Sequence, residues 1–173
     1  MTGPRGMLEQ EQVRIVSITF AILAGAILLS AGVAAIVMGI GAPEMIRLPF
    51  RIFCHGIASR SIEIAGTPMP ICARCTGIYA GMLCAALMWL IRGWSQRIGV
   101  AGWVAVLMII PLAIDGTTQA AGLRESVNAL RLLTGFLAGA GAIGWVMTVV
   151  ARGTEAAPRK CSAFPGGGDP GSA

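Results

Sequence analysis

Ile15 to Ile40 reads IVSITFAILAGAILLSAGVAAIVMGI, an apolar run without a charged side chain. A helix needs about 20 apolar residues to cross the hydrocarbon core of a bilayer. The run is also longer than the roughly 7–15 apolar residues of a cleavable signal peptide. We therefore expect a helix that spans the membrane and remains in the mature protein as an anchor.

Three further apolar segments follow, at residues 71–91, 98–114 and 129–150, and the middle one is the shortest. Apolar residues form 55% of the 173-residue chain and charged residues only 12%. Soluble domains carry about 25% charged residues, so this chain is better suited to lipid than to water. The sequence predicts an all-α, polytopic membrane protein with one domain, residues 1–151, built as a bundle of four transmembrane helices.

The connections between the spans differ in length and character. Residues 41–70 form a long Cys/His loop, and residues 115–128 form a second polar loop. The short connection at residues 92–97 predicts that the second and third spans are antiparallel neighbours. Residues 152–173, rich in Pro, Gly and Ala, are predicted to be a disordered tail. With four spans, both polar loops lie on one side of the membrane and both termini lie on the other.

Glycines at helical spacing predict faces on which helix backbones approach closely. Cys84 follows Gly77 by seven residues, so we expect it to be buried on the same face. A second copy of the chain, or another membrane protein, could also dock on such a face. The glycines are Gly25, Gly32 and Gly39 in the first span, Gly77 and Gly81 in the second, and Gly135 and Gly139 in the fourth.

Three of the five cysteines and the only histidine gather within 22 residues, at Cys54, His55, Cys72 and Cys75. Cys72 and Cys75 are spaced i and i+3 in the first turn of the second helix, so they share one face. A helix N-terminus carries partial positive charge, and Arg74 is adjacent. Both effects lower a thiol pKa and favour the thiolate, which binds metals and attacks disulfides.

Three interpretations of this cluster stay open. In the first, Cys54, His55, Cys72 and Cys75 are the ligands of a tetrahedral metal site, with zinc as the expected ion. In the second, Cys72 is the attacking thiol and Cys75 the resolving thiol of a redox pair, and Cys54 is a third partner in disulfide exchange. In the third, the cysteines only staple or pack the loop against the second helix.

The second polar loop adds charged and polar side chains to the same side of the membrane. Asp115 directly follows an apolar span, where an ionised group is costly unless it is paired. We expect an ion-pair network centred on Asp115, with Arg74 or Arg131 as its partner, or an anion-binding site. The residues predicted to gather there are Arg60, Arg74, Asp115, Gln119, Arg124, Asn128 and Arg131.

The net charge of +5 comes without a basic patch interleaved with aromatic residues, so we expect no nucleic-acid partner. Positive residues favour the cytoplasmic side of a membrane protein. Arginines in a site say less about topology than free loop charges do. Discounting Arg74 and Arg131 favours cytoplasmic N- and C-termini. The cysteines would then face an oxidising compartment that permits disulfides.

Several motifs resemble those of an uncharacterised prokaryotic family, domain of unknown function 2085, over about residues 53–139. The sequence departs from the family at residues 56–58, where the family has a more polar stretch with proline. The resemblance implies a multi-pass protein of a bacterial or archaeal cell membrane, and it implies no activity. The motifs are Cys54-His55, Arg60-Ser61, Pro70-x-Cys72-Ala-Arg74-Cys75-Thr76-Gly77-Ile-Tyr79-x-Gly81, Pro111-Leu-x-Ile-Asp115-Gly116-x-Thr-Gln119 and Gly122-Leu-Arg124-x-Ser126-x-Asn128-x-x-Arg131-x-x-Thr134-Gly135.

These observations favour a small integral membrane protein with a metal-binding or thiol redox site at one membrane face. Whether it is an enzyme stays open. The alternative is a transporter or lipid-binding protein, in which the arginines recognise a phosphate headgroup and the cysteines are structural. A further alternative is a non-catalytic subunit of a membrane complex.

Overall fold

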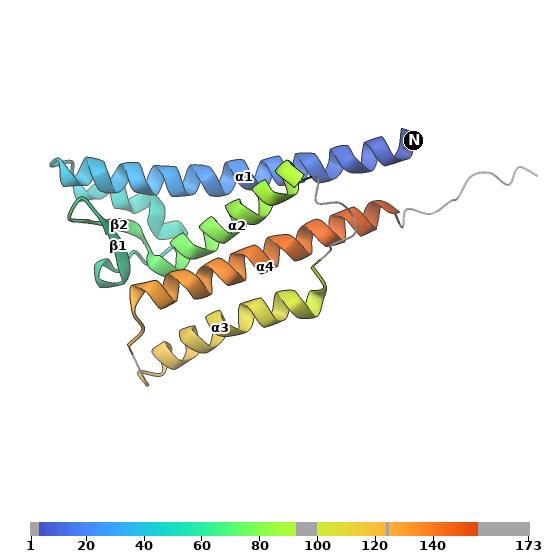
Figure 1. Ribbon diagram of the computed structural model, residues 1–173. Coiled ribbons are helices and arrows are strands. Elements are labelled where there is room, and N and C mark those ends of the chain that lie inside the picture. The colour runs from blue at the N-terminus through green and yellow to red at the C-terminus, as the bar shows by residue number, and fades with distance from the viewer. Residues whose placement is uncertain (1–3, 93–99, 124, 156–173) are drawn as a thin grey trace, which may run out of the picture.

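Four long helices make up most of the protein (Figure 1). The computed structural model describes residues 4–92, 100–123 and 125–155. Each helix contains a stretch long and apolar enough to cross a membrane. The chain is therefore a multi-pass membrane protein with a helical fold, as its apolar segments predicted. The helices are α1 (Pro4–Gly39), α2 (Ala73–Arg92), α3 (Gly102–Ala120) and α4 (Asn128–Glu155).

α3 differs most from its predicted span. It begins at Gly102 rather than at residue 98, and it continues through Pro111 and Asp115 to Ala120. The polar residues after Asp115 fit the helix because their hydroxyls bond back to carbonyls one turn earlier. Thr117 Oγ1 donates to the Ala113 carbonyl at 2.8 Å, and Thr118 Oγ1 donates to the Ile114 carbonyl at 2.7 Å. Residues 115–120 of the predicted loop are therefore helical, and Asp115 lies inside α3.

α4 also exceeds its predicted bounds. It continues to Glu155, so residues 152–155 of the predicted disordered tail are helical. Residues 156–173 lie outside the described residues, and so does most of the connection between α2 and α3.

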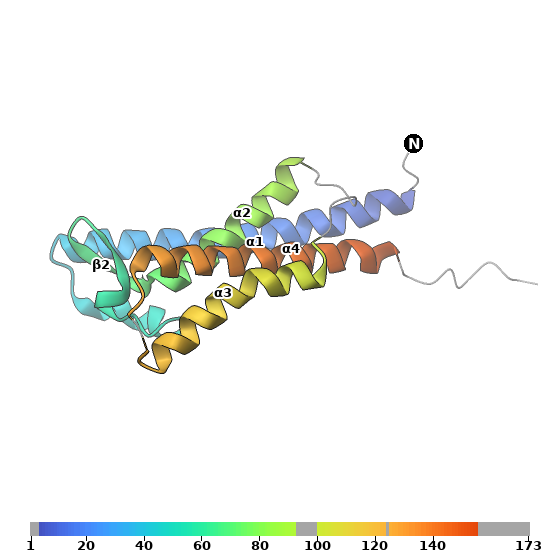
Figure 2. The ribbon, with the colours of Figure 1, turned by 60° about the horizontal axis from the view of Figure 1, so that its bottom comes forward.

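α4 is the central helix of the bundle. Figures 1 and 2 show α2 and α3 on opposite sides of it, and α1 packs mainly against α2. The second and third spans run antiparallel, as predicted, but they are not closely packed neighbours, because α2 and α3 each pack mainly on α4. The prediction about the loops holds in space: the residue 41–70 segment and the α3–α4 connection lie at one end, opposite the N-terminus (Figure 1).

Glycines determine how closely α2 and α4 pack. A Cβ added at any of four glycines in this interface would overlap backbone atoms of the opposite helix. The two small-residue pairs predicted from the sequence thus face each other in the interface between α2 and α4 of one chain. The opposed residues are Gly77 with Leu132, Gly81 with Phe136, Gly135 with Arg74, and Gly139 with Ile78.

The other predicted small-residue positions behave differently. Around Gly32 no atom of the described residues lies within 4 Å of an added Cβ, and at Gly25 the nearest atom is a Leu83 methyl at 3.8 Å. Cys84 is exposed rather than buried. Ala86, two residues further along α2, is buried instead and packs in a cluster with Met147 of α4.

The segment between α1 and α2 contains a β-hairpin that the sequence analysis did not anticipate. Two 3₁₀ helices, η1 (Glu44–Ile52) and η2 (Ala58–Arg60), precede the hairpin in this segment. Strands β1 (Ser61–Ile64) and β2 (Thr67–Cys72) then pair antiparallel, with Ser61 opposite Cys72. Ala65 and Gly66 both have positive φ, +51° and +76°, as a tight two-residue hairpin turn requires.

The hairpin is held against α1 by a small apolar core. Ile71 and Met69 of β2 are buried there with Ala31 and Ala35 of α1, and Cys54 belongs to the same cluster. Burying a large aliphatic side chain stabilises a fold by roughly 1.5–3 kcal/mol. The core therefore fixes β2, and with it the start of α2, against α1.

Candidate functional site

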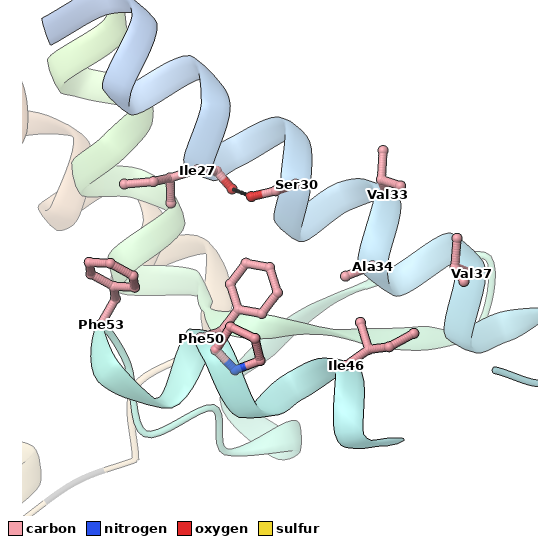
Figure 3. A pocket seen from close by; sticks show the side chains of 9 residues that line it. Ile27, Ser30, Val33, Ala34, Val37, Ile46, Phe50 and Phe53 are labelled. Atoms are coloured by element: carbon pink, nitrogen blue, oxygen red, sulfur yellow. Dashed lines mark hydrogen bonds between the residues drawn. The ribbon is translucent and has the colours of Figure 1, made fainter. Parts of the chain in front are cut away.

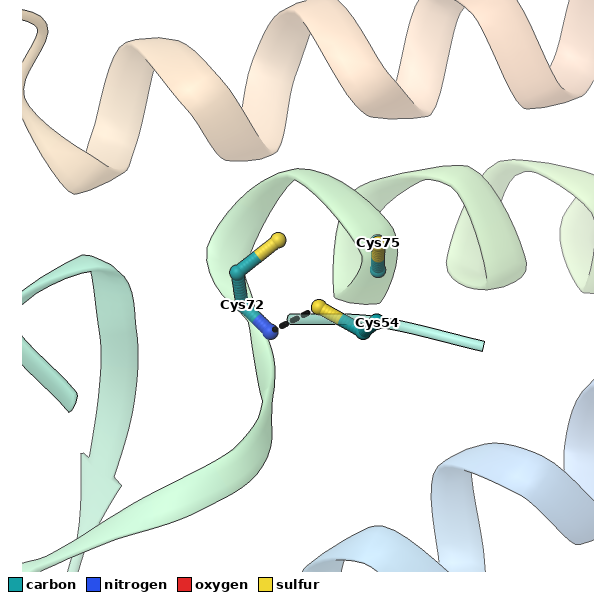
Figure 4. A group of neighbouring side chains, drawn as sticks. All are labelled: Cys54, Cys72 and Cys75. Carbon is teal, nitrogen blue, oxygen red and sulfur yellow. Dashed lines mark hydrogen bonds between the residues drawn. The ribbon is translucent and has the colours of Figure 1, made fainter. Parts of the chain in front are cut away.

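Three cysteines converge at the hairpin end of the bundle (Figure 4). Cys54 follows η1, Cys72 is the last residue of β2, and Cys75 lies in the first turn of α2. Their Sγ atoms all lie within 4.8 Å of one another. Cys54 is buried, Cys72 and Cys75 are half-buried, and the four described cysteines form no disulfide. The Sγ atoms of the cysteine triad, Cys54, Cys72 and Cys75, are thus close enough to share one ligand.

Backbone amides surround the sulfur of Cys54. The Cys72 N–H donates to Cys54 Sγ at 3.2 Å, and the Gly56 N–H donates to it at 3.5 Å. Hydrogen bonds from the Cys72 and Cys75 side chains are the largest effects that lower the pKa of the Cys54 thiol, and these two amides lower it further. Both kinds of hydrogen bond stabilise the thiolate, which is the form that coordinates metals.

Gly56 makes the second of these amide contacts possible. Its φ is +59°, a conformation that favours glycine, and an added Cβ would lie 2.9 Å from the Pro70 carbonyl oxygen. The loop therefore turns sharply after Cys54, and His55 is carried outward. His55 is exposed and is not among the residues whose ligand atoms gather with the triad. A role for His55 as the fourth ligand stays a prediction.

A buried ion pair links α2 to α3 beside the triad. Arg74 donates to Asp115 Oδ2 and, at 3.3 Å, to Gln119 Oε1. Asp115 is 2% exposed and the Arg74 side chain 26% exposed. The ion pair predicted between these residues thus forms, and Arg74 is the partner. Arg74 lies between Cys72 and Cys75 in the chain, so the start of α2 positions both the ion pair and the triad.

The remaining predicted residues lie around the start of α4. Asn128 donates from Nδ2 to the Ser61 carbonyl at 3.2 Å, and its Oδ1 accepts from Arg131 Nη1 at 3.0 Å. Arg131 is buried, and Arg60 is exposed at the end of η2. Asn128 therefore ties β1 to α4. Arg124 lies outside the described residues.

An apolar pocket lies between α1 and η1, away from the charged residues (Figure 3). Its volume is about 620 Å³, and Phe50 and Phe53 face Ala34 and Ile27 of α1 across it. Its lining is almost entirely hydrocarbon. It adds no group capable of acid–base or metal chemistry.

Sequence reasoning missed two contributors to the triad. One is the Gly56 amide, and the other is the hairpin that brings Cys72 to Cys54. Ala65-Gly66 between two short β-prone stretches was the available turn signal. The prolines at positions 68 and 70 obscured it, because proline is rare within strands.

The fold and the triad together define a small multi-pass membrane protein with a thiol cluster at one end of a four-helix bundle. The chain belongs to the family described as predicted membrane protein DUF2085, whose model matches residues 54–145. That match covers the triad, the Arg74–Asp115 pair and the α2–α4 glycines, and it confirms the resemblance of the motifs.

Two archaeal proteins are similar to this chain. An uncharacterised protein of Methanocaldococcus jannaschii is 39% identical over 101 residues, which is 58% of this chain and 65% of that protein. An uncharacterised protein of Methanothermobacter thermautotrophicus is 39% identical over 97 residues, 56% of this chain and 86% of that protein. This chain thus spans just under two thirds of the first relative's length. No solved structure matches the chain.

Proposed function

We propose that this membrane protein binds a soft divalent metal ion, with zinc as the best match, through the thiolates of Cys54, Cys72 and Cys75. The observation that carries the proposal is the convergence of the three Sγ atoms within 4.8 Å. In a tetrahedral zinc site with Zn–S bonds of about 2.3 Å, neighbouring sulfurs lie about 3.8 Å apart. The triad needs only a small contraction to reach that spacing.

The surroundings of the triad also support a metal. The two backbone N–H groups that donate to Cys54 Sγ would hold this sulfur in place as a thiolate ligand. Three protein ligands would leave a fourth position for His55 or for an exogenous ligand, and an open position is typical of reactive zinc sites.

A second candidate function is thiol redox chemistry. It is favoured by the half-burial of Cys72 and Cys75, which keeps these thiols accessible beside the N-terminus of α2. In this case Cys72 attacks a disulfide of a partner, and Cys75 resolves the mixed disulfide. The partner disulfide is then reduced to two thiols, and the Cys72–Cys75 pair is oxidised.

Metal analysis of the purified protein tests the first candidate. We expect about one zinc ion per chain in wild type and a strong loss in Cys75→Ser, because removing one of three thiolates weakens a site of this kind. Cys84→Ser is the matched control, since Cys84 is exposed and lies outside the triad. Substitution with cobalt should add thiolate-to-metal absorption bands in wild type and in the control only.

The same preparations separate the two candidates. A protein without metal, in which thiol trapping shows Cys72 and Cys75 reversibly oxidised, would replace the metal proposal with the redox one. Equal metal content in Cys75→Ser and Cys84→Ser would contradict the metal proposal directly.

We also propose that both termini face the cytoplasm and that the triad faces outward. The support is the distribution of basic residues in the sequence. An alkaline phosphatase fusion placed after Gly122 should be active, and one placed after Arg152 should be inactive, because this reporter folds only outside the cytoplasm. The reverse pattern would place the triad in the reducing cytosol.

A further inference from the structure

A polar cavity of about 630 Å³ lies beside the triad, between η2, the end of α3 and the start of α4. It is separate from the sulfur atoms, and none of the three cysteines lines it. Asn128, which lines the cavity, donates to the Ser61 carbonyl of β1, so the cavity lies next to the hairpin. The polar residues that line it include Arg60, Gln119, Glu125, Ser126, Asn128 and Arg131.

Arg131 places a buried positive charge at the wall of this cavity. Its side chain is 94% buried, since its exposed fraction is only 6%. Nη1 donates to the neutral amide oxygen of Asn128 at 3.0 Å, whereas the buried Nε has no hydrogen-bond partner in the described part of the chain. Burying a cation is costly unless an anion or several acceptors compensate it. The geometry thus presents a buried guanidinium with unused donor capacity at the wall of a cavity.

The other groups around the cavity favour an anion. Arg60 adds a second guanidinium at the exposed rim. Gln119 uses its oxygen to accept from Arg74, which leaves its amide nitrogen to donate elsewhere. The cavity lies at the N-terminus of α4, a 28-residue helix whose dipole is positive at that end. The acidic side chain among the described lining residues is Glu125, which is exposed.

We infer that this cavity binds a phosphate group, held between Arg60 and Arg131. Guanidinium groups bind phosphate oxygens through paired, charge-assisted hydrogen bonds, and a helix N-terminus adds favourable dipoles. Asn128 is a positioning residue, because both ends of its amide are occupied by Ser61 and Arg131. The phosphate is either free phosphate from solution or the headgroup of a phospholipid, since both present the same oxygens.

Binding measurements in a phosphate-free maltoside detergent test this inference. The two probes are inorganic phosphate and a short-chain, soluble phosphatidic acid, each titrated calorimetrically into the full chain. We expect saturable binding of at least one probe. Saturation by inorganic phosphate identifies a free-phosphate site, and saturation by the phosphatidic acid alone identifies a headgroup site.

Three arginine variants provide the controls. Arg131→Gln and Arg60→Gln should weaken binding by about tenfold to a hundredfold, as expected for the loss of a charge-assisted contact. Arg152→Gln should bind like wild type, because Arg152 is exposed near the far end of the same helix. Arg60 is exposed, so Arg60→Gln keeps the test valid even if Arg131→Gln fails to fold. Absence of binding by both probes, or wild-type affinity in Arg60→Gln, would overturn the inference.

Discussion

α1 and α2 are both long and apolar enough to cross a membrane, but they are held in the bundle in different ways. α2 meets α4 backbone to backbone at Gly77 and Gly81, where no side chain would fit. α1 has no comparable contact at Gly32. Instead, small side chains such as Ala31 and Ala35 pack against the hairpin.

The difference separates two roles of sequence in a membrane protein. A long apolar run is enough to place a helix in lipid, because the bilayer itself supplies the apolar surroundings. It does not determine which helices touch, since lipid tails are as apolar as leucine. In this chain the small residues of α2 and α4 decide that question, and the same two helices carry Cys75, Arg74 and Arg131.

The largest expected effect comes from filling the tight interface. Gly77→Leu forces α2 away from the Leu132 carbonyl, and overpacking of this kind costs about 3 kcal/mol or more. Thermal unfolding in detergent should show a large drop in melting temperature for this variant. Gly32→Leu is the matched control and should melt close to wild type, because the space around Gly32 is open. Equal melting temperatures for the two variants would remove the contrast between α1 and α2.

An intermediate effect is expected from the ion pair that joins α2 to α3. Asp115→Asn keeps the shape of the side chain but removes its charge, and Arg74 then loses its anionic partner. Breaking a fully buried pair costs about 3–5 kcal/mol, and the partial exposure of Arg74 reduces the expected loss to about 2 kcal/mol. Chemical or thermal unfolding should detect this loss.

Glu44→Gln serves as the control for charge removal, because Glu44 is exposed and lies in η1. A double-mutant cycle with Arg74→Gln isolates the pair. A coupling energy near zero would show that Arg74 and Asp115 stabilise the bundle separately rather than through each other.

The sequence predicted those features that depend on local pattern. The four spans followed from apolar length, and the close-packing glycine faces of the second and fourth helices followed from i, i+4 spacing. The end of α3 was missed because Asp115, Thr117 and Thr118 have the composition of a loop. Inside the helix their costs are offset by a distant arginine and by carbonyls one turn away. Such compensation depends on the fold and has no signature in local composition.

The triad was predicted more completely than the rest of the site. Cys72 and Cys75 share a helix turn by spacing alone, and Cys54 was close in sequence to the only histidine. Which of Cys54 and His55 would face the other thiols could not be predicted. Adjacent residues in an irregular loop point in different directions, and the turn at Gly56 decides which one faces inward.

The smallest expected effect comes from the polar contact between α1 and α4. Ser17 is buried, and its hydroxyl donates to the Met147 sulfur at 3.4 Å. Hydrogen bonds between transmembrane helices contribute about 0.6 kcal/mol on average, and a thioether is a weak acceptor. Ser17→Ala should therefore lower the free energy of unfolding by less than about 0.6 kcal/mol, measured by the same unfolding assay. Thr19→Ala is the control, because the hydrogen bond of the Thr19 hydroxyl within the described residues goes to the Ile15 carbonyl of its own helix. A loss in Ser17→Ala as large as that in Asp115→Asn would mean that α1, too, depends on a specific polar contact for its place in the bundle.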